Sequence, residues 1–184
     1  NLSYIKFINI LRAGEQTPVM VTFNNIRTIY DLAGKVGRQI EADSAQIADF
    51  LSNQANYSKD GFIKENIIAV FIPDSYEFYW NTTAEGFYRR MLREYNRFWN
   101  DERKRKAESL GLSPIEVSIL ASIVDDEVAK PEEKPRIAGV YINRLRRGMP
   151  LQACPTIKYA LNDFTITRIL DKYLEVESPY NTYK

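Results

Sequence analysis

Three consecutive acidic residues, Asp125, Asp126 and Glu127, are the part of this sequence best suited to acid–base chemistry. The chain contains no histidine. That composition excludes serine–histidine and cysteine–histidine nucleophilic pairs, as well as histidine-ligated metal sites. A general acid or base that works near neutral pH must then be a carboxylate, a lysine, a tyrosine or a cysteine.

Helical geometry separates these acids. On a helix that advances about 100° per residue, three apolar side chains fall within roughly 60° of Glu127: Leu120, Ile123 and Val124. Glu127 is therefore expected on the axis of an apolar stripe, with Asp125 on the opposite face. Loss of hydration there favours the neutral carboxyl group that a general acid requires. The pattern alone leaves open that the glutamate extends to water or pairs with a nearby Lys or Arg.

The helix that carries the acids is predicted over residues 113–129. It begins at Ser113-Pro114-Ile115-Glu116, where the serine and the glutamate form a capping box and the proline takes the first helical position. A Lys-Pro pair breaks this helix, and the next is expected over 132–147. Residues 149–184 are rich in Pro, Thr, Tyr and Asn and are predicted as loops, with a short helix near 165–173.

The first eighty residues predict a smaller, mixed module. Segments 4–11 and 18–23 carry the aromatic and β-branched residues typical of strands, and 67–72 is predicted as a buried strand. Helical spacing between them gives the order β-α-α-β. A long helix over 82–109 is the candidate boundary between two lobes. The predicted fold class is α+β, a small β-α-α-β module plus a mostly helical lobe.

Composition narrows the function further. The chain has 25 basic and 24 acidic residues, a net charge of +1, so a nucleic-acid partner is not expected. A single cysteine, Cys154, excludes an internal disulfide. No run of about 20 apolar residues is present, so no membrane-spanning segment is predicted.

Three segments follow one another in a distinctive order: LASIVDDEV at 120–128, GVYINRLRRGMPLQACPTIKYAL at 139–161 and SPYNTY at 178–183. Their order and spacing resemble the catalytic core of the endolytic murein transglycosylase MltG (YceG-like) family. Upstream, PDSYEFYWNTTAEGF is similar to the segment that enters that family's catalytic domain, and the β-α-α-β order resembles its LysM-like module. The resemblance implies the end of a preceding N-terminal segment at 1–16, a LysM-like module at 17–80 and a catalytic domain at 81–184 that is incomplete at its C-terminal end.

The resemblance implies endolytic cleavage of the MurNAc–GlcNAc β-1,4 bond in nascent peptidoglycan strands, with formation of 1,6-anhydro-MurNAc ends. It implies one carboxyl group as general acid and base, with no metal and no cofactor. The family motif has two acids two residues apart, here Asp125 and Glu127. Together with the helical projection this favours Glu127 as the acid, with Asp125 as the fallback.

The family motif also implies a set of substrate contacts. Amides, hydroxyls and aromatic rings suit sugar hydroxyls and sugar faces, and the matching residues are Asn143, Gln152, Thr156, Tyr159, Tyr180, Asn181 and Tyr183. The sequence departs from the family at Cys154, where an Asp is usual. With no histidine to activate the thiol, Cys154 is expected to be a small, partly buried residue.

The resemblance further implies a bacterial inner-membrane protein with this part in the periplasm, anchored only through an N-terminal segment outside this chain. Peptidoglycan strands are the expected partner, with peptidoglycan synthases as further candidates. An alternative function remains, in which the chain is a non-catalytic peptidoglycan-binding module or a scaffold of a wall-synthesis complex. A carboxyl group on an apolar helix face distinguishes the two, because a pure binder does not need it.

Overall fold

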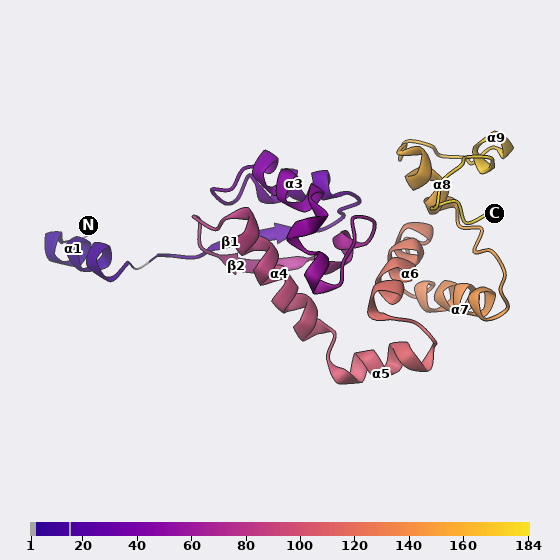
Figure 1. The fold of residues 1–184 in the computed structure, drawn as a ribbon, viewed down its shortest axis with the longest axis horizontal. Coiled ribbons are helices and arrows are strands. Elements are labelled where there is room, and N and C mark those ends of the chain that lie inside the picture. Colours follow the sequence, from indigo (N-terminus) through magenta and orange to yellow (C-terminus); the bar gives the residue numbers. More distant parts are fainter. Residues whose placement is uncertain (1–2, 15) are drawn as a thin grey trace. The chain divides into compact units, whose positions relative to one another are not determined.

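The computed structural model describes residues 3–14 and 16–184 and divides into two compact units, 1–100 and 101–184 (Figure 1). The first unit holds a two-stranded sheet and the second is helical, so the α+β fold class is confirmed. The helices and strands of the first unit are α1 (Tyr4–Ala13), β1 (Val19–Phe23), α2 (Ile29–Val36), α3 (Ser44–Ser52), β2 (Asp74–Phe78) and α4 (Ala84–Phe98).

The sheet is an antiparallel pair in which Val21 lies opposite Tyr76. Val21 and Phe23 are buried while Met20 between them is exposed, which is the alternation of a half-buried strand. The order β1-α2-α3-β2 matches the predicted β-α-α-β order.

α2 and α3 begin with capping boxes, at Thr28–Asp31 and Asp43–Gln46. Between them the chain passes Gly37, where a Cβ atom would lie 2.4 Å from the backbone nitrogen of Ser44. The glycine therefore permits the two helices to approach as closely as they do.

The core of the first unit extends into α4. Phe87 is fully buried, and its ring centroid lies 6.2 Å from that of Phe23 on β1 and 5.4 Å from that of Phe78 on β2. Tyr88 and Met91 are also fully buried. Because α4 supplies core residues to the sheet, it belongs to the same compact unit as the sheet, 1–100.

Three predicted elements of this unit were wrong. Residues 4–11 lie in helix α1, which Ser3 caps at its start and Gly14 ends with φ 63°. The predicted strand 67–72 is a 3₁₀ turn over Ile67–Val70, and the second strand follows Pro73 as β2. The predicted helix 82–109 is two helices, because it breaks after Phe98 and restarts at Asp101.

The second unit contains α5 (Asp101–Ser109), α6 (Pro114–Glu127), α7 (Lys134–Arg146), α8 (Cys154–Leu161) and α9 (Asp171–Leu174). The helices predicted over 113–129 and 132–147 are α6 and α7, and the short helix predicted near 165–173 lies at α9. Treating 149–184 as mainly loops missed α8, in which Pro155 occupies the first turn. The core of the unit packs α6 against α7 and the start of α8 through Leu120, Val124, Tyr141 and Ala153.

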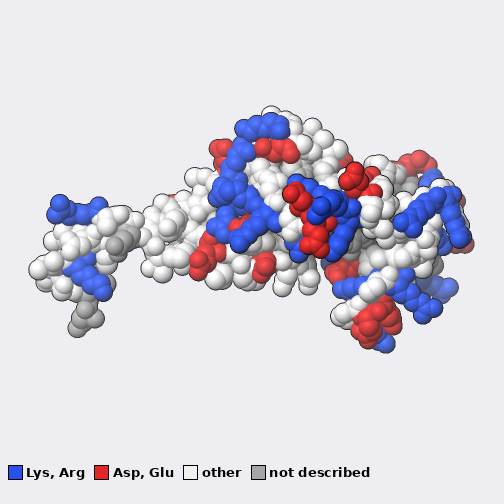
Figure 2. Space-filling model, turned by 90° about the horizontal axis from the view of Figure 1, so that it is seen from below, with Lys and Arg blue, Asp and Glu red and all other residues white. Residues whose placement is uncertain are grey.

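Charged side chains are mixed over the surface. On the face shown in Figure 2, basic and acidic side chains lie interspersed, in keeping with the net charge of +1. In the described part of the chain no single helix is long and apolar enough to cross a membrane, and α5 and α6 meet that test only as a pair bent by 75°.

Candidate active site

Glu127 is the last residue of α6, and its position follows from the local sequence. The capping box of Ser113 and Glu116 fixes the start of the helix, and Val128 leaves it in extended conformation at φ −134°. Leu120 and Val124, two turns and one turn before the end, are buried. Glu127 continues their stripe but is exposed.

The exposure of Glu127 corrects one expectation from the sequence. The helical projection placed the carboxyl group on the apolar face, where it would lose its hydration. The described contacts of that stripe end at Val124, which packs against Tyr141 and Ala153. Glu127 emerges beyond this core, so its carboxyl group borders the packed residues without being buried among them.

Asp125 lies in a different environment. Its carboxylate accepts a hydrogen bond from Lys134 Nζ in a salt bridge, and its side chain is 66% exposed. The bridge joins the end of α6 to the start of α7. Asp125 is thus paired with Lys134, whereas the charge of Glu127 acts on two tyrosines, Tyr141 and Tyr183.

Tyr141 on α7 is one of the tyrosines on which the Glu127 charge acts. Its residue is 6% exposed, with the ring packed in the core of the second unit. Burial raises the pKa of the Tyr141 phenol to about 12, and the Glu127 carboxylate and a hydrogen bond to it add to the rise. The Tyr141 phenol therefore lies close enough to Glu127 to respond to its charge.

Tyr183 and Cys154 complete the group. The Tyr183 hydroxyl oxygen lies 3.5 Å from Cys154 Sγ. Burial, this contact and the charge of Glu127 raise the pKa of Tyr183 to about 12. We refer to Glu127, Tyr141, Cys154 and Tyr183 as the acid cluster, drawn from α6, α7, α8 and the final residues. Cys154 is partly buried, as predicted.

The loop between α7 and α8 is fixed by Arg144. Its guanidinium Nη1 donates to the carbonyl oxygens of Pro150 at 3.1 Å and Leu151 at 2.9 Å, and to Gln152 Oε1 at 3.0 Å. Gln152 adopts φ 54°, a left-handed conformation that costs energy for a residue with a side chain. Its backbone N–H donates to Thr182 at 2.8 Å.

The final residues are tied to the start of α8. The Thr182 hydroxyl accepts from the Ala153 N–H at 3.0 Å and lies 2.9 Å from the hydroxyl of buried Thr156. The Asn181 amide donates to the carbonyls of Leu174 and Val176 at 2.8 and 2.9 Å. In this structure Thr156 and Asn181 thus hold the loops that carry Tyr183.

The remaining predicted substrate contacts are Tyr159, Tyr180 and Asn143. The rings of Tyr159 and Tyr180 meet edge to face, with centroids 4.8 Å apart, and Tyr159 is 37% exposed. Asn143 is exposed and lies about 200° around α7 from Tyr141, so the helix turns it away from the cluster. The substrate contacts assigned to these residues stay predictions.

Sequence reasoning missed Tyr141 as a site residue. It was assigned to the apolar stripe of its helix, which is where its ring lies. The signal was present in the resemblance, because the tyrosine stands two residues before Asn143 in the GVYINRL segment. Its contact with Glu127 depends on how α6 packs on α7, which the spacing of either helix does not specify.

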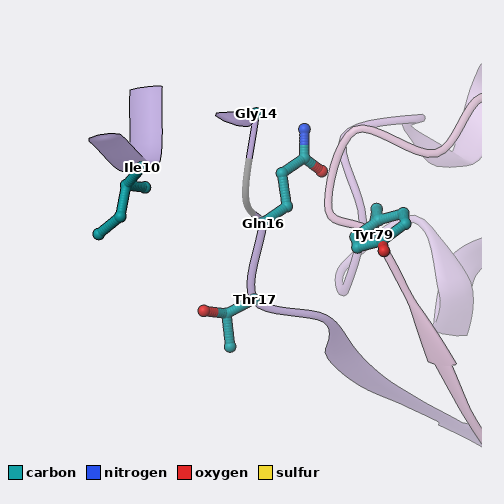
Figure 3. Close-up of a pocket in the computed structure, with 5 residues that line it drawn as sticks. All are labelled: Ile10, Gly14, Gln16, Thr17 and Tyr79. Carbon is teal, nitrogen blue, oxygen red and sulfur yellow. The ribbon is translucent and has the colours of Figure 1, made fainter. Parts of the chain in front are cut away.

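The first unit also holds a carboxylate beside a buried tyrosine, because the Tyr88 hydroxyl donates to Asp60 at 2.8 Å, but that carboxylate is already paired with Arg89. A surface depression in the first unit is lined by Ile10, Gly14, Gln16, Thr17 and Tyr79. Figure 3 shows the Gln16 side chain extending toward the Tyr79 ring. None of these described lining residues carries a carboxyl group. Within the described residues, no three His, Cys, Asp or Glu side chains group to hold a metal ion.

The fold and the site define an α+β protein whose helical unit presents an exposed acid beside a buried tyrosine, Tyr141, and a partly buried one, Tyr183. The chain belongs to the YceG-like family, whose family model matches residues 1–184. This confirms the resemblance drawn from the three segments.

Two relatives carry the name endolytic murein transglycosylase. The Bacillus subtilis protein is 32% identical over 126 residues, which are 66% of this chain and 34% of that protein. The protein of Streptococcus pneumoniae serotype 2 is 32% identical over 130 residues, 68% of this chain and 23% of that protein. The chain thus spans about a third or less of the length of these relatives.

A solved structure supports the fold. The crystal structure of a YceG-like protein from Listeria monocytogenes matches with a TM-score of 0.70 at 20% sequence identity. The match covers 100% of this chain and 65% of that chain.

Proposed function

We propose that this chain carries the catalytic part of an endolytic peptidoglycan lytic transglycosylase, with Glu127 as the general acid and base. The bond cleaved is the MurNAc–GlcNAc β-1,4 bond of nascent strands, and the product ends in 1,6-anhydro-MurNAc. The observation that carries the proposal is the exposed Glu127 carboxyl group at the end of α6, bordered by the Tyr141 phenol. Membership of the YceG-like family supports the reaction class.

The reaction needs one carboxyl group that gives a proton and takes one back. The Glu127 carboxyl donates its proton to the glycosidic oxygen, the bond from C1 to that oxygen breaks, and an oxocarbenium-like state develops on MurNAc. The 6-hydroxyl oxygen of the same sugar then bonds to C1. Its proton passes to the Glu127 carboxylate, which restores the acid. No water is consumed.

The surroundings of Glu127 suit the role of general acid better than those of Asp125. The Asp125 carboxylate is engaged by Lys134 in a salt bridge. Glu127 is open to solvent, so a glycan can reach it. A sugar laid over the carboxyl group displaces water, and that loss of hydration favours the protonated form at the moment of reaction.

The cluster provides a single carboxyl group. Hydrolytic glycosidases ordinarily use a pair of carboxylates, one of which activates water or forms a covalent bond. In the acid cluster the place of the family's usual Asp is taken by Cys154, whose thiol lies against Tyr183. This supports closure by the sugar's own hydroxyl group over attack by water.

Further parts of the proposal concern the whole protein. The order β1-α2-α3-β2 supports a LysM-like module in the first unit that holds glycan for the second. The substrate places the active part outside the cytoplasm, and anchoring to the inner membrane with action in the periplasm belongs to the same proposal. Peptidoglycan synthases are the proposed protein partners.

The experiment compares glycan cleavage by wild type, Glu127→Gln and Asp125→Asn on uncross-linked peptidoglycan strands, with strand length and end groups read by mass spectrometry. Glu127→Gln keeps the shape of the side chain and removes its proton, so cleavage should fall by at least about 100-fold. Asp125→Asn makes the same change two residues away and should retain most of the activity.

Two results would contradict the assignment of Glu127 as the general acid. Equal cleavage by wild type and Glu127→Gln would exclude Glu127 as the acid, and loss confined to Asp125→Asn would move the role to the fallback. Glycan binding without cleavage by all three proteins would favour the alternative of a non-catalytic binding module.

A further inference from the structure

Tyr141 combines a buried ring with a reactive neighbour. The ring packs with Leu120 and Val124, two residues of α6, and the residue is 6% exposed. Glu127 follows Val124 by three residues and therefore lies on the same face of α6, one turn closer to its end. A tyrosine packed against that stripe therefore lies near the Glu127 carboxyl group, whose charge acts on the phenol.

Contacts between α6 and α7 hold Tyr141 in position beside the end of α6. α6 packs against α7, its neighbour in Figure 1, and Ile137 and Ala138 of α7 lie beside the same core. The salt bridge of Asp125 with Lys134 ties the end of α6 to the start of α7. The ring of Tyr141 is therefore held in place by the residues packed around it.

Glu127 is the less constrained partner. It ends its helix and is exposed, and its side chain has several rotatable bonds. Unless a neighbour holds it, such a carboxyl group samples many directions, and a general acid must lie within hydrogen-bond reach of the glycosidic oxygen. A phenol that donates to one carboxylate oxygen leaves the other free to carry the proton.

We propose that Tyr141 is the positioning residue of the active site, whose phenolic hydroxyl donates to one oxygen of Glu127 and aims the other at the substrate. This inference rests on the proposed function for its catalytic consequence. The contact itself is a property of the folded chain and can be tested without any reaction.

The first test measures the contact. Wild type, Glu127→Gln and Asp125→Asn are labelled with tyrosine carrying ¹³C at Cζ, and the resonance of Tyr141, assigned by its loss in Tyr141→Phe, is followed against pH. The charged groups that act on this phenol are Glu127 of α6, Arg144 of α7 and Cys154 of α8. Tyr183 of the final residues lies beside them.

The expected results follow from the sign of each charge. The Glu127 carboxylate opposes formation of the phenolate, so Glu127→Gln should lower the pKa of Tyr141 from about 12, while burial keeps it above the ordinary value. Asp125→Asn removes the same charge from the same helix but should leave the titration in place, because Asp125 pairs with Lys134. An equal titration in wild type and Glu127→Gln would overturn the proposal.

The second test measures how loss of the Tyr141 hydroxyl group affects glycan cleavage. Tyr141→Phe keeps the ring in the core and removes only the donor, so the melting temperature should stay close to that of wild type. We expect kcat to fall roughly ten- to hundredfold, with KM little changed, because a hydrogen bond to a charged group is lost. Tyr173→Phe removes a phenolic oxygen from α9, outside the acid cluster, and serves as the matched control.

The outcomes separate the two proposals. If wild type cleaves glycan and Tyr141→Phe does so with the same kcat, Tyr141 only packs the core and the inference fails. If wild type does not cleave glycan at all, the proposed function fails and so does the catalytic role of Tyr141, while the titration still decides whether the contact exists.

Discussion

Asp125 and Glu127 stand two residues apart on one helix, yet the fold gives them different neighbours. Lys134 forms a salt bridge with Asp125, while Tyr141 and Tyr183 border Glu127. A helix turns by about 200° over two residues, so the two carboxyl groups point to opposite sides. Their chemical difference therefore arises from the packing of α6 on α7 rather than from residue type.

Cys154 gives a prediction at this scale. Its thiol is partly buried beside Tyr183, and we assign it no chemical role. Cys154→Ser keeps a small side chain that can hydrogen-bond to Tyr183 and should retain most of the activity. Alkylation of the wild-type thiol with iodoacetamide adds bulk next to Glu127 and should block cleavage, as measured by release of glycan ends.

The control is the alkylating reagent applied to Cys154→Ser. Cys154 is the one cysteine of the chain, so that variant should be resistant. Loss of activity in untreated Cys154→Ser as complete as in Glu127→Gln would contradict the account, because it would give the thiol a part in the reaction.

Among the elements, the turn between α2 and α3 has the sharpest steric requirement. A Cβ atom at Gly37 would lie 2.4 Å from the backbone nitrogen of Ser44. The backbone conformation of Gly37 is an ordinary helical one at φ −63°, so the requirement is for space rather than for rotational freedom. Gly37→Ala should destabilise the protein by about 1–3 kcal/mol, measured by urea unfolding.

Gly34 in the same helix is the matched control. An added Cβ atom there meets nothing within 4 Å, and the residue lies inside α2. Gly34→Ala should therefore stabilise the protein by about 0.5–1 kcal/mol, since alanine loses less conformational freedom on folding than glycine. Similar effects of the two substitutions would show that α2 and α3 are not held as closely as described.

Elements with explicit end signals were predictable from the sequence. The Ser113–Glu116 capping box located the start of α6, and helical spacing located α7. The strand predicted at 67–72 failed because a short apolar run does not distinguish a strand from a buried turn. α8 was missed because Pro155 was taken for a loop residue, although proline is also common in the first helical turn.

The candidate site was predictable only in part, because contacts between helices cannot be predicted from the spacing within one helix. Glu127 and Tyr183 could be proposed from the sequence because each lies in a short segment that resembles the family motif. The roles of Tyr141 and Arg144 depend on contacts between α6, α7 and the loop before α8. Spacing within one helix specifies which face a side chain occupies but not what packs against it.

The described chain consists of two units, each with its own buried aromatic groups. The tyrosines among these groups determine how folding stability changes at alkaline pH. Tyr76 in the first unit and Tyr141 and Tyr183 in the second have pKa values raised to about 12, mainly by burial. The ordinary tyrosine value in an unfolded chain is about 10. The folded protein therefore binds these protons more tightly than the unfolded chain does.

The sign of the pH effect follows. Stability from these tyrosines is fully present below about pH 10 and is lost as the pH rises toward 12. The urea midpoint should fall steeply over this window. Tyr76→Phe, which removes one of the three ionisations, should weaken the dependence, and a flat urea midpoint across the window would contradict the burial of these phenols.

The central claim is that one carboxyl group, Glu127, cleaves the glycan without water. The most direct measurement digests peptidoglycan strands with wild type and Glu127→Gln in ¹⁸O-labelled water and examines the new MurNAc ends by mass spectrometry. The account predicts ends lighter by one water than ordinary reducing ends, free of ¹⁸O, and absent from the Glu127→Gln digest. New ends that contain ¹⁸O, or anhydro ends that persist in Glu127→Gln, would contradict it.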